Sequence, residues 1–188
     1  MREGTRTVVI LLAIIAVAGV RSALGETLSV GLSDVAVIAG NVGKNDVARV
    51  VLHVNVPEPV LNASIDFAEL TFPAFLSDTS KDAVTVVTHC AQTRWQRDRV
   101  TWTEPWKRQG GDFDSVGCAW YASVPGRKHA VVLDITKAVR SWQHGRENCG
   151  LFLKRPEHEG GGFLGERERL RAALNSARVK FYYTPGQE

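Results

Sequence analysis

The sequence contains few cysteines and lacks the short motifs of common catalytic and metal sites. Its three cysteines, Cys90, Cys118 and Cys149, include no C-x-x-C pair, which argues against a tetrahedral zinc site. Three pairings and a fully reduced state all stay open, and the odd count leaves at least one thiol unpaired within the chain. No G-x-S-x-G or H-E-x-x-H pattern occurs, and the adjacent His89 and Cys90 would point to opposite faces of a strand. We therefore expect a non-catalytic protein without catalytic residues.

The chain also lacks a strong excess of charge of one sign. It has 23 basic and 20 acidic residues, and residues 1–25 hold Arg2, Arg6, Arg21 and Glu3. Residues 26–188 therefore carry 20 basic and 19 acidic residues. A nucleic-acid-binding domain needs a clearly positive balance and a clustered basic face, so nucleic acid is not an expected partner.

Long apolar stretches are confined to the start of the chain. Val8–Val20 is an unbroken apolar run, and Ala23 and Gly25 suit the small-residue positions of a signal-peptidase site. The run is shorter than the roughly 20 apolar residues that cross a bilayer, which favours a cleaved signal peptide over an anchor. We expect residues 1–25 to be this signal peptide and residues 26–188 to form one secreted domain, extracellular or at the cell surface, without a membrane span.

After residue 25, few segments have the apolar periodicity of a long helix, and short apolar segments are frequent. The segment 48–56 alternates, so that Val50 and Leu52 fall on one face while Val51 and His53 fall on the other. This pattern and the frequent turn residues predict an all-β, jelly-roll-like β-sandwich rather than an α/β fold. Strands are expected at residues 27–30, 35–38, 48–56, 63–72, 84–90, 99–103, 120–124, 129–135, 150–154 and 178–184. In 63–72 the inward residues are expected to be Ile65, Phe67 and Leu70, with a possible bulge.

One short helix is expected between two strands, at residues 136–143. Asp134 or Thr136 can accept the free N–H groups at its start, and Gly145 suits the left-handed residue that ends a helix. Ile135, Val139 and Trp142 form one apolar stripe, so we expect Trp142 to be core, with a ligand platform as the lesser alternative. A further helical turn or two is expected within residues 166–173.

Two stretches carry a resemblance to a known family. VVLDITKAVRSWQHGRENCGLFL (131–153), followed by GGGFLGERE and the final ARVKFYY, resembles the C-terminal half of the DNRLRE-domain family, as does TRWQRDRVTWTEPW (93–106). The resemblance covers residues 35–184 and implies a secreted, carbohydrate-binding-module-like β-sandwich. The matching positions, which we interpret as structural, are Trp95, Val100, Thr101, Trp102, Pro105, Asp134, Thr136, Trp142, Asn148 and Gly150. The chain departs from the family at Gln96, at 166–168 and in a longer loop at 107–118, and the resemblance does not identify a ligand.

The candidate ligand-binding residues are an aromatic ring and nearby cations. Trp106 is followed by Lys107 and Arg108, and an exposed tryptophan beside two cations suits an acidic polysaccharide. An equal alternative is that Trp106 covers the sandwich while the two cations are solvated. Arg167 and Arg169 are the second group of candidate ligand-binding residues.

A calcium site is a weaker hypothesis. Asp112 and Asp114 lie two residues apart in the glycine-rich segment GGDFDS, and alternating carboxylates on such a loop can bind Ca²⁺ together with backbone carbonyls. Solvated loop carboxylates are the alternative. No other cofactor is expected.

Three functions remain open at this stage. The first is a secreted, non-catalytic module that binds an extracellular polysaccharide, acidic or otherwise. The second is a structural or adhesive cell-surface protein whose partner is another protein, and an unpaired cysteine would allow an intermolecular disulfide. The remote third is a polysaccharide lyase, since the Arg-Glu-Arg segment 167–169 resembles an alginate lyase motif although the rest of the acid–base set is incomplete. The oligomeric state is not predicted.

Overall fold

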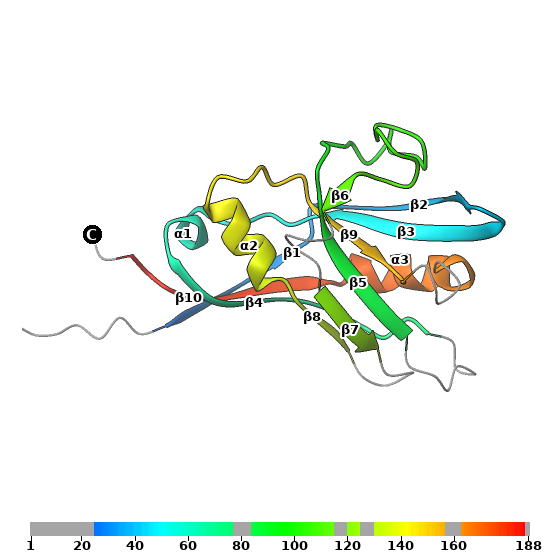
Figure 1. Ribbon diagram of the computed structural model, residues 1–188. Helices are drawn as coiled ribbons and strands as arrows, with labels where there is room; N and C mark the ends of the chain where they lie inside the picture. Colours follow the sequence, from blue (N-terminus) through cyan, green and yellow to red (C-terminus); the bar gives the residue numbers. More distant parts are fainter. Residues whose placement is uncertain (1–24, 77–83, 115–119, 125–129, 157–162, 187–188) are drawn as a thin grey trace, which may run out of the picture.

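The computed structural model describes residues 25–76, 84–114, 120–124, 130–156 and 163–186, so the predicted signal peptide lies outside it apart from Gly25. The described residues form two antiparallel sheets that pack as a jelly-roll-like sandwich (Figure 1), which confirms the predicted fold class. In order, the first sheet contains β1 (Glu26–Gly31), β10 (Arg178–Thr184), β4 (Ser64–Phe72) and β8 (Val131–Asp134). The second contains β2 (Asp34–Val42), β3 (Asn45–His53), β9 (Leu151–Lys154) and β5 (Val84–Ala91), and β5 also pairs with β6 (Phe113–Asp114) and β7 (Trp120–Val124).

The main hydrophobic core lies between the two sheets. It forms because alternate side chains of each strand point to the same face. Each large apolar side chain that is fully buried there stabilises the fold by about 1.5–3 kcal/mol. The fully buried members from the strands include Val50, Leu52, Leu70, Phe72, Leu133, Leu151, Leu153, Val179 and Phe181.

A second core covers the outer face of the second sheet. Val51 and Phe152, which point away from the first sheet, are fully buried beneath the segment 92–112. Three tryptophans of that segment, Trp95, Trp102 and Trp106, provide most of the cover. Both faces of β3 and β9 are therefore buried, and β9 has four buried residues in a row instead of an alternating pattern.

Two expectations about individual strands are wrong. Residues 99–103 are not a strand but part of the covering loop, in which Trp102 turns inward while Thr101 and Thr103 are exposed. The second wrong expectation is that Phe67 faces inward from β4. The expected bulge does exist in this strand, since the register with β10 shifts between Tyr182 and Tyr183. The bulge reverses the facing after Ile65, so Ala68 lies in the core and Phe67 lies on the outer face of the sheet.

The predicted helix is confirmed as α2 (Thr136–Gln143). Its start is fixed by Asp134, which accepts the Thr136 N–H at 2.9 Å, and its end is followed by Gly145 at φ 91°. Trp142 is buried in the main core as predicted, so α2 closes one end of the sandwich.

The other helical elements are short. Among the described residues they are α1 (Glu58–Leu61), the 3₁₀ turn η2 (Leu164–Glu166) and α3 (Arg167–Asn175). Within the described part of the chain, no helix has the length and apolar character that crossing a bilayer requires.

Candidate ligand-binding site

The loop between β5 and β6 is held in place by its tryptophans. Trp95 Nε1 donates to the Cys149 carbonyl at 3.0 Å, and Trp106 Nε1 donates to the Thr101 carbonyl at 2.9 Å. Trp102 lies under the guanidinium of Arg49, whose Cζ is 5.0 Å from the ring centroid. Buried indoles that also donate hydrogen bonds allow one orientation, so the loop is a fixed support for its exposed side chains.

The expectation that Trp106 presents an exposed ring is wrong. Its side chain belongs to the outer core, where its ring meets Phe152 edge-on at 5.1 Å and the residue is only 6% exposed. The alternative interpretation therefore applies, in which Trp106 covers the sandwich and Lys107 and Arg108 are exposed. The indole cannot stack on a sugar in this arrangement.

Asp112, one of the two predicted calcium ligands, organises the same loop. Its buried carboxylate accepts the N–H groups of Lys107 at 2.7 Å and Arg108 at 3.0 Å, and the hydroxyl of Thr93 at 3.0 Å. Burial alone would raise the pKa of Asp112, but these hydrogen bonds and the nearby Arg108 side chain lower it below its ordinary value. The carboxylate is therefore ionised and used in holding the loop.

Asp114 does not join Asp112 in a shared site. Its carboxylate pairs with Arg146 at 2.9 Å, on the segment between α2 and β9. Among the residues that the structure describes, no group of three or more potential metal ligands comes together. Calcium binding stays a prediction, and the two carboxylates named for it have protein partners instead.

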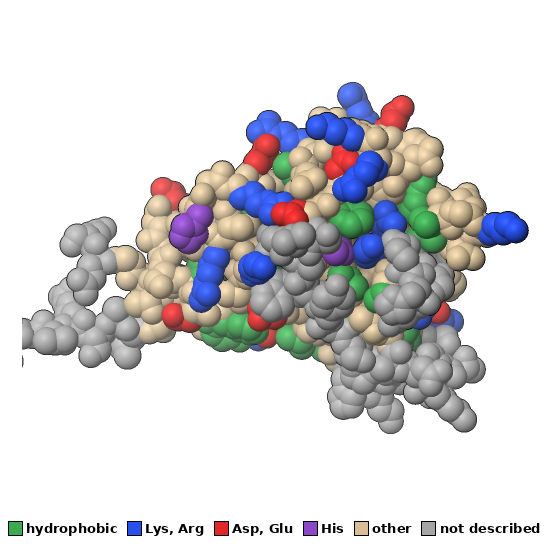
Figure 2. Space-filling view, viewed as in Figure 1, with side chains coloured by type: hydrophobic (Ala, Val, Ile, Leu, Met, Phe, Trp, Pro, Cys, Tyr) green, Lys and Arg blue, Asp and Glu red, His purple; other side chains and the backbone are tan. Residues whose placement is uncertain are grey.

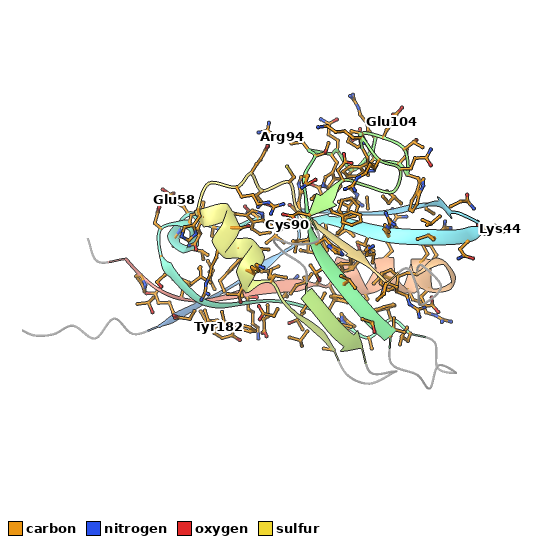
Figure 3. The ribbon with its side chains drawn as sticks, viewed as in Figure 1. Lys44, Glu58, Cys90, Arg94, Glu104 and Tyr182 are labelled. Carbon is orange, nitrogen blue, oxygen red and sulfur yellow. The ribbon has the colours of Figure 1, made fainter. Side chains whose placement is uncertain are left out.

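A large cavity opens between this loop and the segment before β9. Its volume is about 840 Å³, within the range of ligand sites. Trp95, Val100, Pro105 and Cys149 provide apolar lining, and the polar lining comes from His53, Arg94, Gln96, Arg99, Glu104, Glu147 and Asn148. Figure 3 shows Arg94 and Glu104 pointing outward from this end of the molecule, whereas Lys44 lies at the tip of the β2–β3 hairpin.

A short turn places the polar residues of the second wall. Asn148 donates to the Val54 carbonyl at 2.8 Å and accepts the Gly150 N–H at 3.0 Å, as its predicted structural role requires. Gly150 adopts φ 93°, which favours glycine. This turn aligns Glu147 with Arg94 across the cavity, and the two side chains form an exposed ion pair.

Two side chains that line the cavity, His53 and Cys149, have pKa values that burial shifts. His53 contacts Trp95 edge-on, with ring centroids 4.4 Å apart, and burial lowers its pKa although Asp34 lies 4.0 Å from Nδ1 and opposes this effect. Cys149 is a free thiol that is only 2% exposed, and burial raises its pKa. A thiol with a raised pKa is a poor nucleophile because little thiolate is present.

A second, smaller depression adjoins the cavity across Val100, which lines both. Its volume is about 310 Å³. Arg97 and Asp98 of the loop and Arg171 of α3 provide its charges, and Val35–Val37 of β2 provide its apolar base. The two hollows therefore share Val100, with Arg94 and Arg99 in the lining of one and Arg97 and Arg171 in the lining of the other.

The predicted residues Arg167 and Arg169 do not reach this surface. Residues 167–175 form a helix, in which Arg167 pairs with Glu168 and Arg169 lines a different hollow beside Phe75 and Leu76. Arg171, further along the same helix, is the one that meets the loop. The Arg-Glu-Arg segment 167–169 therefore lies on α3 and not on a strand.

Charge is unevenly distributed over this end of the molecule. In Figure 2 basic side chains are frequent along the edge formed by the loop, with acidic ones among them. The exposed charges of residues 92–111 are Arg94, Arg97, Arg99, Lys107 and Arg108 against Asp98 and Glu104. A chain that is nearly neutral overall thus carries a locally positive surface, which composition alone did not indicate.

Several residues that line the cavity were not predicted from the sequence. His53 was assigned to the outer face of its strand, but nothing local indicated that 94–105 and 147–149 would enclose it. The signal that could have identified the loop was its density of arginines between tryptophans. The comparisons with known proteins add no constraint, because no protein-family model and no curated protein sequence matches this chain. The resemblance to the DNRLRE-domain family stays a prediction.

Proposed function

We propose that this protein is a secreted, non-catalytic module that binds an acidic polysaccharide in the cavity beside Val100. The observation that supports this most is the 840 Å³ cavity with Arg94 and Arg99 in its lining, on a loop that three buried tryptophans hold rigid. Loops fixed on a rigid sandwich are a common place for binding residues.

The chemistry of the lining suits an anionic sugar chain. Arginine presents a planar set of donors that matches a carboxylate or sulfate group, and Arg94 is already oriented by Glu147. Gln96 and Glu104 add a donor and acceptors for hydroxyl groups, and Val100 and Pro105 offer apolar contacts to the face of a sugar ring. The adjoining depression with Arg97 and Arg171 would take the next acidic residue of the chain.

The two competing functions receive less support. Cys149 is buried, so it does not offer the exposed thiol on which a disulfide-linked assembly would depend. The exposed large apolar side chains among the described residues are Val42, Leu61 and Val132, on three separate elements, which does not resemble the apolar centre of a stable protein interface. For a lyase, the Arg-Glu-Arg segment that suggested it lies on α3, outside the cavity lining.

The test is affinity electrophoresis of the purified protein in gels that contain alginate, polygalacturonate or a sulfated galactan. We expect retardation by at least one of these, and we expect Arg99→Ala to weaken the binding roughly tenfold, as for loss of a charge-assisted hydrogen bond. Arg99→Lys should restore only part of the binding, because lysine keeps the positive charge but lacks the planar, bidentate donors of the guanidinium. Raising the salt concentration should weaken binding of the unmodified protein.

Lys44→Ala is the matched control, since it removes the same charge from the distant hairpin tip. If Arg99→Ala and Lys44→Ala bind equally well, the cavity is not the site. Trp106→Ala is unsuitable as a test, because Trp106 belongs to the core and its loss would disturb the whole loop.

A further inference from the structure

The outer face of the first sheet carries a pair of aromatic side chains that packing does not bury. Phe67 of β4 and Tyr182 of β10 are directly opposite each other in the sheet, and their ring centroids are 5.9 Å apart with the planes tilted by 39°. Both are partly exposed. Figure 3 shows Tyr182 pointing away from the second sheet, on the opposite side of the sandwich from Arg94 and Glu104.

The position of this pair is set by the bulge in β4. Without the register shift at Asp66, Phe67 would enter the core. The bulge is stabilised by Arg140 of α2, which donates to the Ile65 carbonyl at 2.7 Å and to the Asp66 carbonyl at 3.2 Å. Tyr182 is oriented in turn by a 3.3 Å hydrogen bond from its hydroxyl to Glu69. The two rings are therefore held outward before any ligand arrives.

A hollow of about 440 Å³ lies beside Phe67, between β4 and the start of α2. Its lining is Asp66, Phe67, Asp134, Thr136, Lys137 and Arg140, with two acidic and two basic side chains. One oxygen of Asp134 accepts the Thr136 N–H, and one oxygen of Asp66 accepts the Thr184 hydroxyl at 3.2 Å. An ionised carboxylate has about four acceptor positions, so both keep capacity for further donors.

We infer that this face is a separate binding site for a neutral polysaccharide. The C–H face of a sugar ring would lie on Phe67 and Tyr182, and its hydroxyls would donate to Asp66 and Asp134 and accept from Lys137. The hollow has two acidic and two basic side chains, so it gives a uronate or sulfate no net electrostatic attraction, and this favours a neutral chain. This site lies on the opposite face from the cavity and does not depend on the function proposed for it.

The test uses affinity electrophoresis and calorimetric titration of the purified protein with hydroxyethylcellulose, arabinoxylan and glucomannan. We expect at least one of these to bind, Phe67→Ala and Tyr182→Ala each to weaken the binding roughly tenfold, and Phe67→Leu to weaken it almost as much. Phe67→Leu keeps a large apolar side chain but removes the aromatic ring, so it separates loss of the ring from any loss of folding. Tyr182→Phe should bind nearly as well as the unmodified protein.

Val132→Ala is the matched control. Val132 is an outward apolar side chain on the same sheet, 49% exposed and outside the hollow, and its loss should leave binding unchanged. Arg99→Ala should not affect neutral polysaccharides, and Phe67→Ala should not affect acidic ones. The inference is overturned if the folded protein binds none of the three neutral polymers, or if Phe67→Leu and Val132→Ala behave alike. It is also overturned if sedimentation shows a dimer that Phe67→Ala converts to a monomer, since the face would then be a self-association surface.

Discussion

At the scale of single residues, His89 is the clearest case of a polar side chain whose burial costs free energy. It points from β5 into the outer core, is 3% exposed, and neither ring nitrogen has a hydrogen-bond partner among the described residues. Its ring lies 4.7 Å from that of Phe113. Burial, with the nearby cations Lys154 and Arg49, lowers the pKa of His89 to about 4, although Asp114 opposes this.

This lowered pKa predicts acid sensitivity. Between pH 6.5 and 4 the unfolded chain binds a proton at this histidine and the folded protein does not, so the free energy of unfolding should fall as the pH falls. The expected loss is at most about 1.4 kcal/mol per pH unit in that range. Urea denaturation at pH 7, 6, 5 and 4 should show this slope, and His89→Phe should reduce it.

Comparing the unmodified protein with His89→Phe separates the contribution of His89 to the pH dependence from the contributions of other titratable groups. His53 also has a lowered pKa and contributes in the same direction, but it is present in both. Asp112 has a lowered carboxyl pKa, so the stability it provides is present above about pH 4 and is lost only below that. Equal slopes for His89→Phe and the unmodified protein would show that His89 is not held neutral by the fold.

At the scale of elements, the second sheet depends on a close contact between a strand and the loop. Gly40 of β2 lies against the indole of Trp102, so that a Cβ at residue 40 would be 2.2 Å from the ring. Because the contact is with a buried aromatic ring rather than a mobile side chain, Trp102 would have to leave its position. The strand expected at residues 35–38 is longer in the structure, where β2 continues through Gly40 to Val42.

We therefore expect Gly40→Ala to destabilise the protein by about 1–3 kcal/mol, as for an overpacked core. The melting temperature and the near-ultraviolet circular dichroism of the tryptophans would report this. Gly165→Ala is the control, because a Cβ there meets nothing within 4 Å. A Gly40→Ala protein as stable as Gly165→Ala would mean that the loop does not pack on β2 as described.

How far the sequence predicted these elements depended on whether local signals agreed with packing. The bounds of α2 and β10 were predicted correctly, since a capping residue, an apolar stripe and strict alternation fix them locally. Residues 99–103 were misassigned because Val100, Thr101 and Trp102 favour strands, while the tryptophan is needed to cover the second sheet. Phe67 was misplaced because alternation does not show where a bulge falls.

The candidate site was predictable only in part for the same reason. Arginines and tryptophans between 94 and 108 were visible, but which of them face solvent depends on the outer core beneath. The cavity joins His53, the loop and the turn at Asn148, which lie far apart in the sequence. No local sequence pattern predicts that these segments lie next to each other. They do so only because β3, β9 and β5 are neighbours in the second sheet.

At the scale of the whole molecule, the sandwich separates two chemically different surfaces. The loop side has more exposed basic than acidic side chains and contains the cavity, and the outer face of the first sheet has an aromatic pair beside a hollow of balanced charge. A rigid protein with a site on each side could join two polysaccharide chains, and simultaneous engagement would raise the apparent affinity for a mixed matrix. Binding to a gel that contains an acidic and a neutral polymer together tests this directly against each polymer alone.

The cysteines decide whether such a molecule acts as a single chain in an oxidising environment. Cys90 is disulfide-bonded, Cys149 is a free thiol, and Cys118 lies outside the described residues. An exposed free thiol would form intermolecular disulfides in such an environment, but Cys149 is only 2% exposed, and its carbonyl accepts the indole N–H of Trp95. Burial also raises its pKa, so the reactive thiolate is scarce at neutral pH.

We expect Cys149 in the native protein to react slowly with iodoacetamide at pH 7.5, and to react fully once the protein is unfolded in guanidinium chloride. Peptide mapping by mass spectrometry would locate the label, and Cys149→Ser would abolish it at that position. Electrophoresis without reductant should show no Cys149-linked dimer. Rapid labelling of the native protein, or a dimer band that both reductant and Cys149→Ser remove, would contradict this. Such a result would favour a disulfide-linked structural role over the single-chain polysaccharide-binding module, because the thiol would then be available to a second molecule.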